Sequence, residues 1–234
     1  MNDESLLSIS DTTNLNTKAT AVTRARYRRI APVYDFLEIL PELRYRPWRT
    51  QFWQTVATNL YPGGQLLEIG VGTGNNMPFW PKNAQITAVD LNPSMLKRAK
   101  SLAERLGIYA NIELGDVQAL AFPDNTFDVA AATFVFCSVP DPVLGLKELM
   151  RVVRPGGWVF LMEHVRAQHP IPGKLMDLLN PLVARTMGPN INRDTVGNVQ
   201  LSGLELVEVN DLGMGGIFKI ISAYVGTTEK ERAN

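Results

Sequence analysis

The glycine-rich run at residues 66–75, Leu-Leu-Glu-Ile-Gly-Val-Gly-Thr-Gly-Asn, constrains the fold more than any other part of the chain. A hydrophobic run leads into it, and Gly70, Gly72 and Gly74 then follow at alternate positions. Glycine adopts left-handed backbone conformations readily and lets the backbone approach a ligand closely. A buried strand that feeds such a loop and then a helix forms the nucleotide-binding crevice of doubly wound sheets. The run therefore predicts a strand over 65–70 and a nucleotide-like ligand beside the loop.

The spacing of the glycines excludes two common nucleotide signatures. The dinucleotide fingerprint is G-x-G-x-x-G/A, whereas here the third glycine comes one residue earlier and Asn75 and Asn76 follow it. The phosphate-binding P-loop requires a lysine directly after its last glycine, a position that Asn75 occupies here. The expected ligand is therefore neither a dinucleotide nor a triphosphate.

Two acids at the ends of the next two predicted strands narrow the choice of nucleotide-like ligand. Asp90 ends the apolar run at 85–90, where an acid accepts hydrogen bonds from ribose hydroxyls. Asp90 could instead cap the next helix, but Asn92 and Pro93 already supply a helix start, which favours the ligand role. Asp116 follows the run at 111–115, at an edge where an acid can accept from an adenine amino group.

These motifs, together with Leu-Met-Arg-Val-Val-Arg-Pro-Gly-Gly at 149–157, resemble the class I S-adenosylmethionine-dependent methyltransferases over about residues 64–164. The resemblance implies S-adenosylmethionine as cofactor, with the glycine loop beside the methionine moiety, Asp90 on the ribose and Asp116 near the adenine. It also implies that Glu68 fixes the loop and approaches the methionine amino group. The other cofactor-binding residues that it implies are Asn75, Leu91, Met95, Val117 and Thr133.

The alternation of strand-like and helix-like runs predicts one α/β domain with a parallel sheet. The resemblance implies a Rossmann-like seven-stranded sheet, mostly parallel with the last strand antiparallel, and helices on both faces. Strands are expected at 65–70, 85–90, 111–115, 127–134, 157–164, 203–210 and 216–225, and helices near 20–31, 46–60, 75–80, 93–106, 141–153, 172–187 and 192–202. We predict a disordered tail at 1–17, a helical lid or acceptor segment at 18–61, a cofactor-binding core at 62–226 with a helical insert at 167–202, and a flexible tail at 227–234.

Composition limits the partners. The formal net charge is zero and the isoelectric point is near 6.7, so bulk charge gives a nucleic-acid partner no support. The single cysteine, Cys137, excludes an intramolecular disulfide and a cysteine-cluster zinc site, and we expect no metal. The N-terminus lacks the pattern of a secretory signal, and no apolar run approaches the ~20 residues that span a bilayer. We expect a cytoplasmic protein that can also associate with the inner membrane face.

The N-terminal segment and the later strand ends are the candidates for the acceptor site. Basic residues alternate with aromatics before and around Trp48, which suits either an interfacial helix on anionic lipid or a helix that covers the sheet. Tyr-x-x-Ile-Ala-Pro-Val-Tyr-Asp, at 27–35, resembles the N-terminal lid of methyltransferases with lipophilic acceptors, such as phosphatidylethanolamine N-methyltransferases and quinone C-methyltransferases. By this resemblance Tyr27 and Tyr34 are candidates for the catalytic site.

Three later features carry alternatives. His164 ends a predicted strand, where it can act as a base near neutral pH or bond to backbone. Cys137 is interpreted as a buried thiol rather than a nucleophile. The apolar residues of the insert either line an acceptor pocket or belong to the core, and they are Leu175, Met176, Leu178 and Leu179.

The sequence thus predicts methyl transfer to a lipophilic or small-molecule acceptor, foremost the amine of phosphatidylethanolamine. Quinone C-methylation and thiol S-methylation are the enzymatic alternatives. A protein that binds S-adenosylmethionine without catalysis is the alternative from another class, because glycines and acids predict binding rather than turnover.

Overall fold

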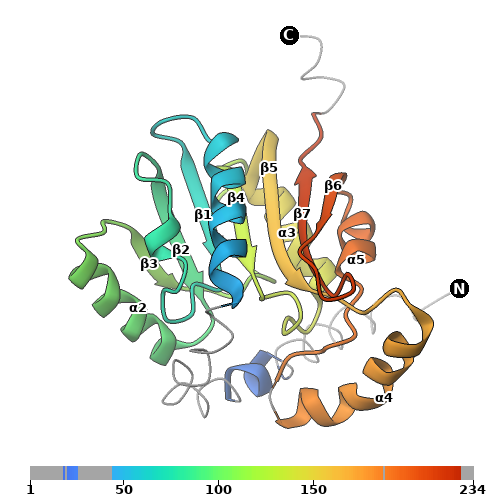
Figure 1. The fold of residues 1–234 in the computed structure, drawn as a ribbon. Helices are drawn as coiled ribbons and strands as arrows, with labels where there is room; N and C mark the ends of the chain where they lie inside the picture. The colour runs from blue at the N-terminus through green and yellow to red at the C-terminus, as the bar shows by residue number, and fades with distance from the viewer. Residues whose placement is uncertain (1–17, 19, 26–43, 187, 228–234) are drawn as a thin grey trace, which may run out of the picture.

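One seven-stranded sheet organises the part of the chain that the structure describes. This structure is a computed structural model, and it describes residues 18, 20–25, 44–186 and 188–227. The strand order is β3-β2-β1-β4-β5-β7-β6 (Figure 1). The strands are β1 (Gln65–Ile69), β2 (Gln85–Asp90), β3 (Asn111–Leu114), β4 (Phe127–Thr133), β5 (Val153–His164), β6 (Glu205–Asp211) and β7 (Phe218–Tyr224). Only β7 runs against its neighbours, so the predicted sheet with an antiparallel last strand is confirmed.

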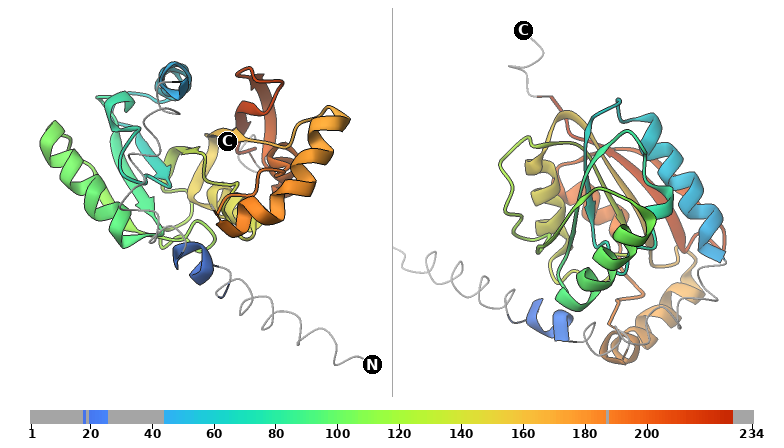
Figure 2. Two further views of the ribbon diagram at one scale, coloured as in Figure 1. Left: turned by 60° about the horizontal axis from the view of Figure 1, so that its bottom comes forward. Right: turned by 90° about the vertical axis from the view of Figure 1, so that its left-hand side faces the viewer.

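Helices cover both faces of the sheet, as predicted (Figures 1 and 2). The helix of residues 44–58 and α2 (Pro93–Leu106) pack on one face, where their apolar side chains share a core with Leu66 and other strand residues. On the other face, α3 (Pro142–Val152) and α5 (Thr195–Ser202) share a second core with Leu67 and its neighbours. Successive strand residues point to opposite faces, so each buried strand supplies both cores.

Polar caps set several helix boundaries. Asn92 accepts a hydrogen bond from the backbone N–H of Ser94 at the start of α2, which confirms the predicted helix start. Asp194 caps α5 in the same way, so this helix begins at 195 rather than 192. The helix predicted near 75–80 is a single 3₁₀ turn, η1 (Met77–Phe79). α4 (Pro170–Thr186) follows the predicted 172–187 closely.

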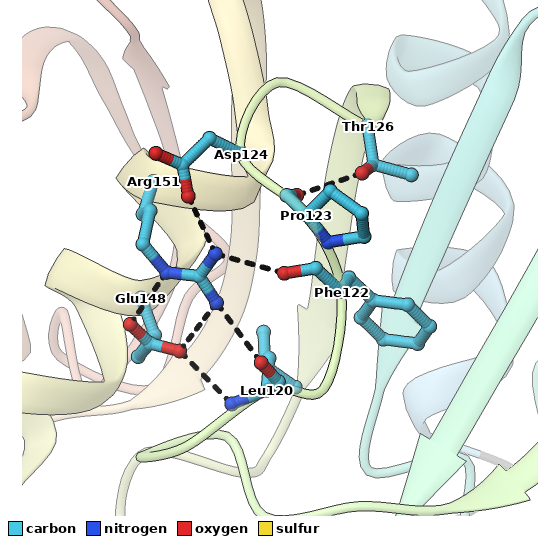
Figure 3. Close-up of polar contacts among 7 residues, drawn as sticks. All are labelled: Leu120, Phe122, Pro123, Asp124, Thr126, Glu148 and Arg151. Carbon is cyan, nitrogen blue, oxygen red and sulfur yellow. Dashed lines mark hydrogen bonds and ion pairs between the residues drawn. The ribbon is translucent and has the colours of Figure 1, made fainter.

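Arg151 of α3 holds the loop between β3 and β4 in place (Figure 3). Its guanidinium donates to the carbonyl oxygens of Phe122 at 2.8 Å and Leu120 at 2.9 Å, and it forms a two-pronged ion pair with Glu148. Asp124 forms a further ion pair with Arg151, with 2.7 Å between the guanidinium nitrogen and Oδ1. This loop includes Asp116, so the clamp fixes one wall of the site described next.

Part of the predicted organisation lies outside the described residues: the tails at 1–17 and 228–234, and residues 26–43 with Tyr27 and Tyr34. The division into lid, core and insert stays a prediction.

Candidate active site

The glycine loop after β1 has the backbone geometry that only glycine adopts at low cost. Gly70, Gly72 and Gly74 have φ values of +69°, +56° and +99°. A Cβ on Gly70 would lie 2.4 Å from Cγ2 of Val135, and one on Gly74 would lie 2.9 Å from Cδ2 of Leu102. A Cβ on Gly72 would meet nothing nearer than 4.0 Å. Gly70 and Gly74 are therefore required for packing as well as for backbone conformation, whereas the space beside Gly72 is open.

Asp90, at the end of β2, ties the glycine loop to the start of α2. Its Oδ2 accepts from the backbone N–H of Gly72 at 2.9 Å, and its Oδ1 accepts from that of Asn92 at 2.8 Å. Burial raises the pKa of Asp90, while these two hydrogen bonds work against that rise. Each carboxylate oxygen has a second acceptor position, so the side chain can bind the loop and a ligand hydroxyl together.

A cavity of about 850 Å³ opens at the carboxyl ends of β1 to β4. The carboxyl ends of the strands are where open α/β sheets bind ligands. Eight of the predicted cofactor residues line it: Gly70, Gly72, Asp90, Leu91, Met95, Asp116, Val117 and Thr133. The structure therefore brings most of the predicted set together around one space.

A smaller cavity of about 450 Å³ adjoins the first across the glycine loop. Thr133 and Phe134 line both cavities, and Asn75 lines the smaller one. Phe134 is a non-glycine residue with a φ of +58°, and its N–H donates to the carbonyl oxygen of Met162 at 2.8 Å. Such left-handed residues concentrate at functional sites.

The N-terminal helix of residues 20–25 lies at the Asp116 end of the larger cavity. The hydroxyl of Thr20 donates to Oδ2 of Asp116 at 3.2 Å, and Nε2 of Gln118 donates to the Thr20 oxygen at 3.0 Å. Thr23 and Arg24 form part of the cavity wall. The pattern of the sequence gave no signal for Thr20 or Gln118, because single polar residues on a helix and in a turn are common.

Glu68 occupies the centre of a buried polar network behind the loop. Its oxygens accept from Nδ2 of Asn76 and, at 2.6 Å, from Nε1 of Trp80. Arg49 donates to Oδ1 of Asn76 at 2.5 Å and to the hydroxyl of Thr133 at 3.2 Å. Burial raises the pKa of Glu68 to about 7. Glu68 thus fixes the loop from behind and lines neither cavity, and its approach to the methionine amino group stays a prediction.

Arg49 is a further functional candidate that the sequence did not predict. It is 4% exposed, lines the smaller cavity, and lies with its guanidinium carbon 5.7 Å from the ring centre of Phe134. Tyr45, on the same helix, lines that cavity too. A basic residue in an amphipathic helix normally faces water, so the pattern gave no reason to single out Arg49.

The aromatics of the helix of residues 44–58 belong to the core. Trp48, Phe52 and Trp53 are 8%, 0% and 1% exposed. Of the two interpretations of this segment, the covering helix is confirmed for these residues, and insertion of the three rings into lipid is wrong. The amphipathic pattern fits both environments, and only the position of the sheet distinguishes them.

His164 lies at the end of β5 against Phe218, with ring centroids 5.3 Å apart. Burial lowers its pKa, which favours the neutral form of the ring. It lines neither cavity. Its role as a base therefore stays a prediction.

Cys137 and Glu163 support the loop that follows β4. Burial raises the pKa of the Cys137 thiol to about 12, which confirms the interpretation as a buried thiol. Oε1 of Glu163 accepts from the backbone N–H groups of Val135 at 2.8 Å and Phe136 at 3.0 Å, and burial raises the pKa of Glu163 to about 7. This carboxyl therefore shapes the wall between Phe134 and Val139.

For the apolar group of α4, the core interpretation is confirmed for Met176, and both the core and the pocket interpretations are wrong for the three leucines. Met176 is buried, but Leu175, Leu178 and Leu179 are 54%, 75% and 43% exposed. These three leucines therefore belong neither to the core nor to a cavity wall, because α4 rests on the protein through a different face.

Fold and site together identify the chain as a member of the class I S-adenosylmethionine-dependent methyltransferases, and S-adenosylmethionine is its cofactor. The described residues fit this cofactor. Asp90 ends β2, the space beside Gly72 is open, and both residues line the same cavity. A family model described as a methyltransferase domain matches residues 67–161.

Particular relatives extend the match over most of the chain. A phosphatidylethanolamine N-methyltransferase of Cereibacter sphaeroides is 32% identical over 203 residues, which cover 86% of this chain and 96% of that relative. The ubiquinone/menaquinone biosynthesis C-methyltransferase UbiE of Shewanella halifaxensis is 29% identical and covers 72% of this chain and 69% of its own length. Among solved structures, the [4+2]-cyclase SpnF has the same fold, with a TM-score of 0.65 at 19% identity, over 76% of this chain and 82% of that one.

Proposed function

We propose that this enzyme transfers the methyl group of S-adenosylmethionine to the amine headgroup of phosphatidylethanolamine. The observation that carries the proposal is the near-full-length similarity to a phosphatidylethanolamine N-methyltransferase, which extends beyond the cofactor core into the acceptor half. Quinone C-methylation is the second candidate, because the chain is also similar to UbiE over a shorter span.

Each end of the joined cavities has a proposed role. In the larger cavity Asp90 would accept hydrogen bonds from the ribose hydroxyls, while Asp116 and Gln118 would form the adenine end. Gly72 and Asn75 border the methionine part, and Arg49 is placed to attract its carboxylate across the smaller cavity. Positive charge there complements the one carboxylate of the cofactor.

The cofactor supplies a methyl group on a sulfonium, a leaving group that needs no further activation. The protein has to align donor and acceptor and exclude water, and alignment alone can contribute several kcal/mol. The wall that Thr133 and Phe134 share between the two cavities is the proposed place of transfer.

An amine has to lose its proton before it can accept a methyl group. Beside the wall that Thr133 and Phe134 form, the smaller cavity presents the rings of Tyr45 and Phe134. Removal of an amine from water lowers its pKa, so rings that exclude water from this wall favour the neutral, nucleophilic form. The same arrangement is less suited to a quinol carbon, which depends more on a general base.

Methyl-labelled S-adenosylmethionine distinguishes the candidates directly. We expect label in phosphatidylethanolamine when the protein is incubated with vesicles of that lipid. Label in a demethylated quinol or a small thiol, with none in the lipid, would replace the proposal by the corresponding alternative. Calorimetric binding of S-adenosylmethionine without transfer to any acceptor would indicate a non-catalytic binding protein.

A further inference from the structure

α4 exposes a continuous apolar stripe. Its members recur at spacings that place them on one side of a helix, and they are Ile171, Leu175, Leu178, Leu179 and Leu182, at 75%, 54%, 75%, 43% and 63% exposed. On the opposite side, Gly173 and Met176 are buried against the protein. The helix therefore has two apolar sides, of which the larger faces solvent, and soluble proteins rarely expose such patches without a partner.

Positive charge borders this stripe. Lys174 and Arg185 lie along one edge of it, at helical spacings from Ile171, Leu178 and Leu182, and both are exposed. Asp177, the acid of this helix, lies on a different side and binds Arg166 at 2.8 Å. An apolar face with lysine or arginine at its border is typical of helices that lie in the interface of an anionic membrane, where long basic side chains reach the headgroups.

The stripe lies at the edge of the molecule where the site opens. α4 follows the carboxyl end of β5, and Figures 1 and 2 show it at the same edge of the sheet as the helix of residues 20–25. That helix forms part of the wall of the larger cavity. A surface that covers the stripe would thus lie at the same edge of the sheet as the larger cavity.

We propose that the outer face of α4 docks this protein onto an anionic lipid bilayer. The inference rests on the proposed function in that the acceptor would be a lipid of the same bilayer. Charge favours a bilayer over a second copy of the chain: two α4 faces placed together would add Lys174 and Arg185 of one copy to those of the other, with Asp177 already bound by Arg166.

Flotation with vesicles of phosphatidylethanolamine and phosphatidylglycerol tests the docking face. The double variant Leu178→Ser/Leu182→Ser removes two of the most exposed members of the stripe, and we expect its vesicle partition to fall at least ~tenfold. Leu201→Ser is the matched control, because Leu201 is 71% exposed on α5, and it should float like the wild type. Lys174→Glu/Arg185→Glu should also reduce binding, and added salt should weaken wild-type binding.

Thermal unfolding tests whether each variant is folded. We expect melting temperatures like that of the wild type, because the replaced residues are exposed and contribute little to the core. Equal flotation of the double variant and the wild type would overturn the inference. A wild-type dimer that becomes monomeric in the double variant, with unchanged flotation, would assign the stripe to a second copy instead. A methylation assay with phosphatidylethanolamine in detergent micelles tests the proposed acceptor independently of docking. If the wild type does not methylate this lipid in micelles, the proposed acceptor is wrong. The docking face is tested by flotation alone.

Discussion

Replacement of Asp90 by alanine should weaken S-adenosylmethionine binding by about 1.5–3 kcal/mol, or roughly 10- to 150-fold in Kd. The magnitude follows from the carboxylate, which holds the N–H groups of Gly72 and Asn92 at 2.9 and 2.8 Å and is proposed to accept from the ribose as well. A hydrogen bond to a charged group contributes about 1.5–3 kcal/mol, and alanine removes the acceptor entirely.

The effect on stability should be smaller. The two N–H groups that lose their acceptor border a cavity of about 850 Å³, so water can replace part of the carboxylate. We expect the free energy of unfolding to fall by about 1–2 kcal/mol.

Isothermal titration calorimetry with S-adenosylmethionine, on protein shown to be folded by circular dichroism, measures the first effect. Asp90→Asn keeps the size of the side chain and one acceptor oxygen, and should lose less affinity than Asp90→Ala. Glu104→Ala is the control, because Glu104 is an exposed acid on α2 that lines neither cavity. Unchanged affinity in folded Asp90→Ala would refute the ribose assignment.

Further variants test the supports of the site. Arg151→Ala should lower the free energy of unfolding by about 1–3 kcal/mol in chemical denaturation, because it removes the donor to two loop carbonyls; Arg151→Lys should recover only part, since an ammonium lacks the guanidinium fork. Glu163→Gln should make the free energy of unfolding depend less on pH. The pKa of Glu163 in the folded protein, about 7, lies above the ordinary 4.5, so its contribution to stability is complete below 4.5 and is lost as pH rises through 7. The slope of unfolding free energy between about pH 5 and about pH 8 should therefore be smaller in Glu163→Gln, and an identical slope would contradict it. Gly70→Ala should lower the melting temperature more than Gly72→Ala, because both have positive φ but only the first Cβ meets Val135, at 2.4 Å; an equal loss would refute the packing argument.

The sequence predicted those site residues that lie at the ends of strands, where a ligand requires a glycine or an acid. Gly72, Asp90 and Asp116 were predicted because parallel strands bring their carboxyl ends to one edge, whatever covers the sheet. All three line the cavity. The positions of the strands were predicted from short runs between turn residues, whereas the seven-stranded topology was predicted from the family resemblance.

The remaining residues depend on tertiary packing, which a local pattern does not contain. Asn75 and Asn76 are adjacent, and only the turn into η1 decides that Asn76 reaches Glu68 while Asn75 lines the smaller cavity. Arg49 is buried because its helix covers the loop, not because its own neighbours are apolar. The leucines of α4 have the same period whether they face the core, a pocket or lipid, and solvent exposure alone distinguishes these cases.

The most direct test of the account is lipid mass spectrometry after incubation of the full chain with methyl-labelled S-adenosylmethionine and vesicles of phosphatidylethanolamine and phosphatidylglycerol. We expect labelled N-methylated phosphatidylethanolamine, unlabelled phosphatidylglycerol, and a strongly reduced yield in Asp90→Ala. Tight binding of S-adenosylmethionine with no label in phosphatidylethanolamine, whether in vesicles or in detergent micelles, would contradict it.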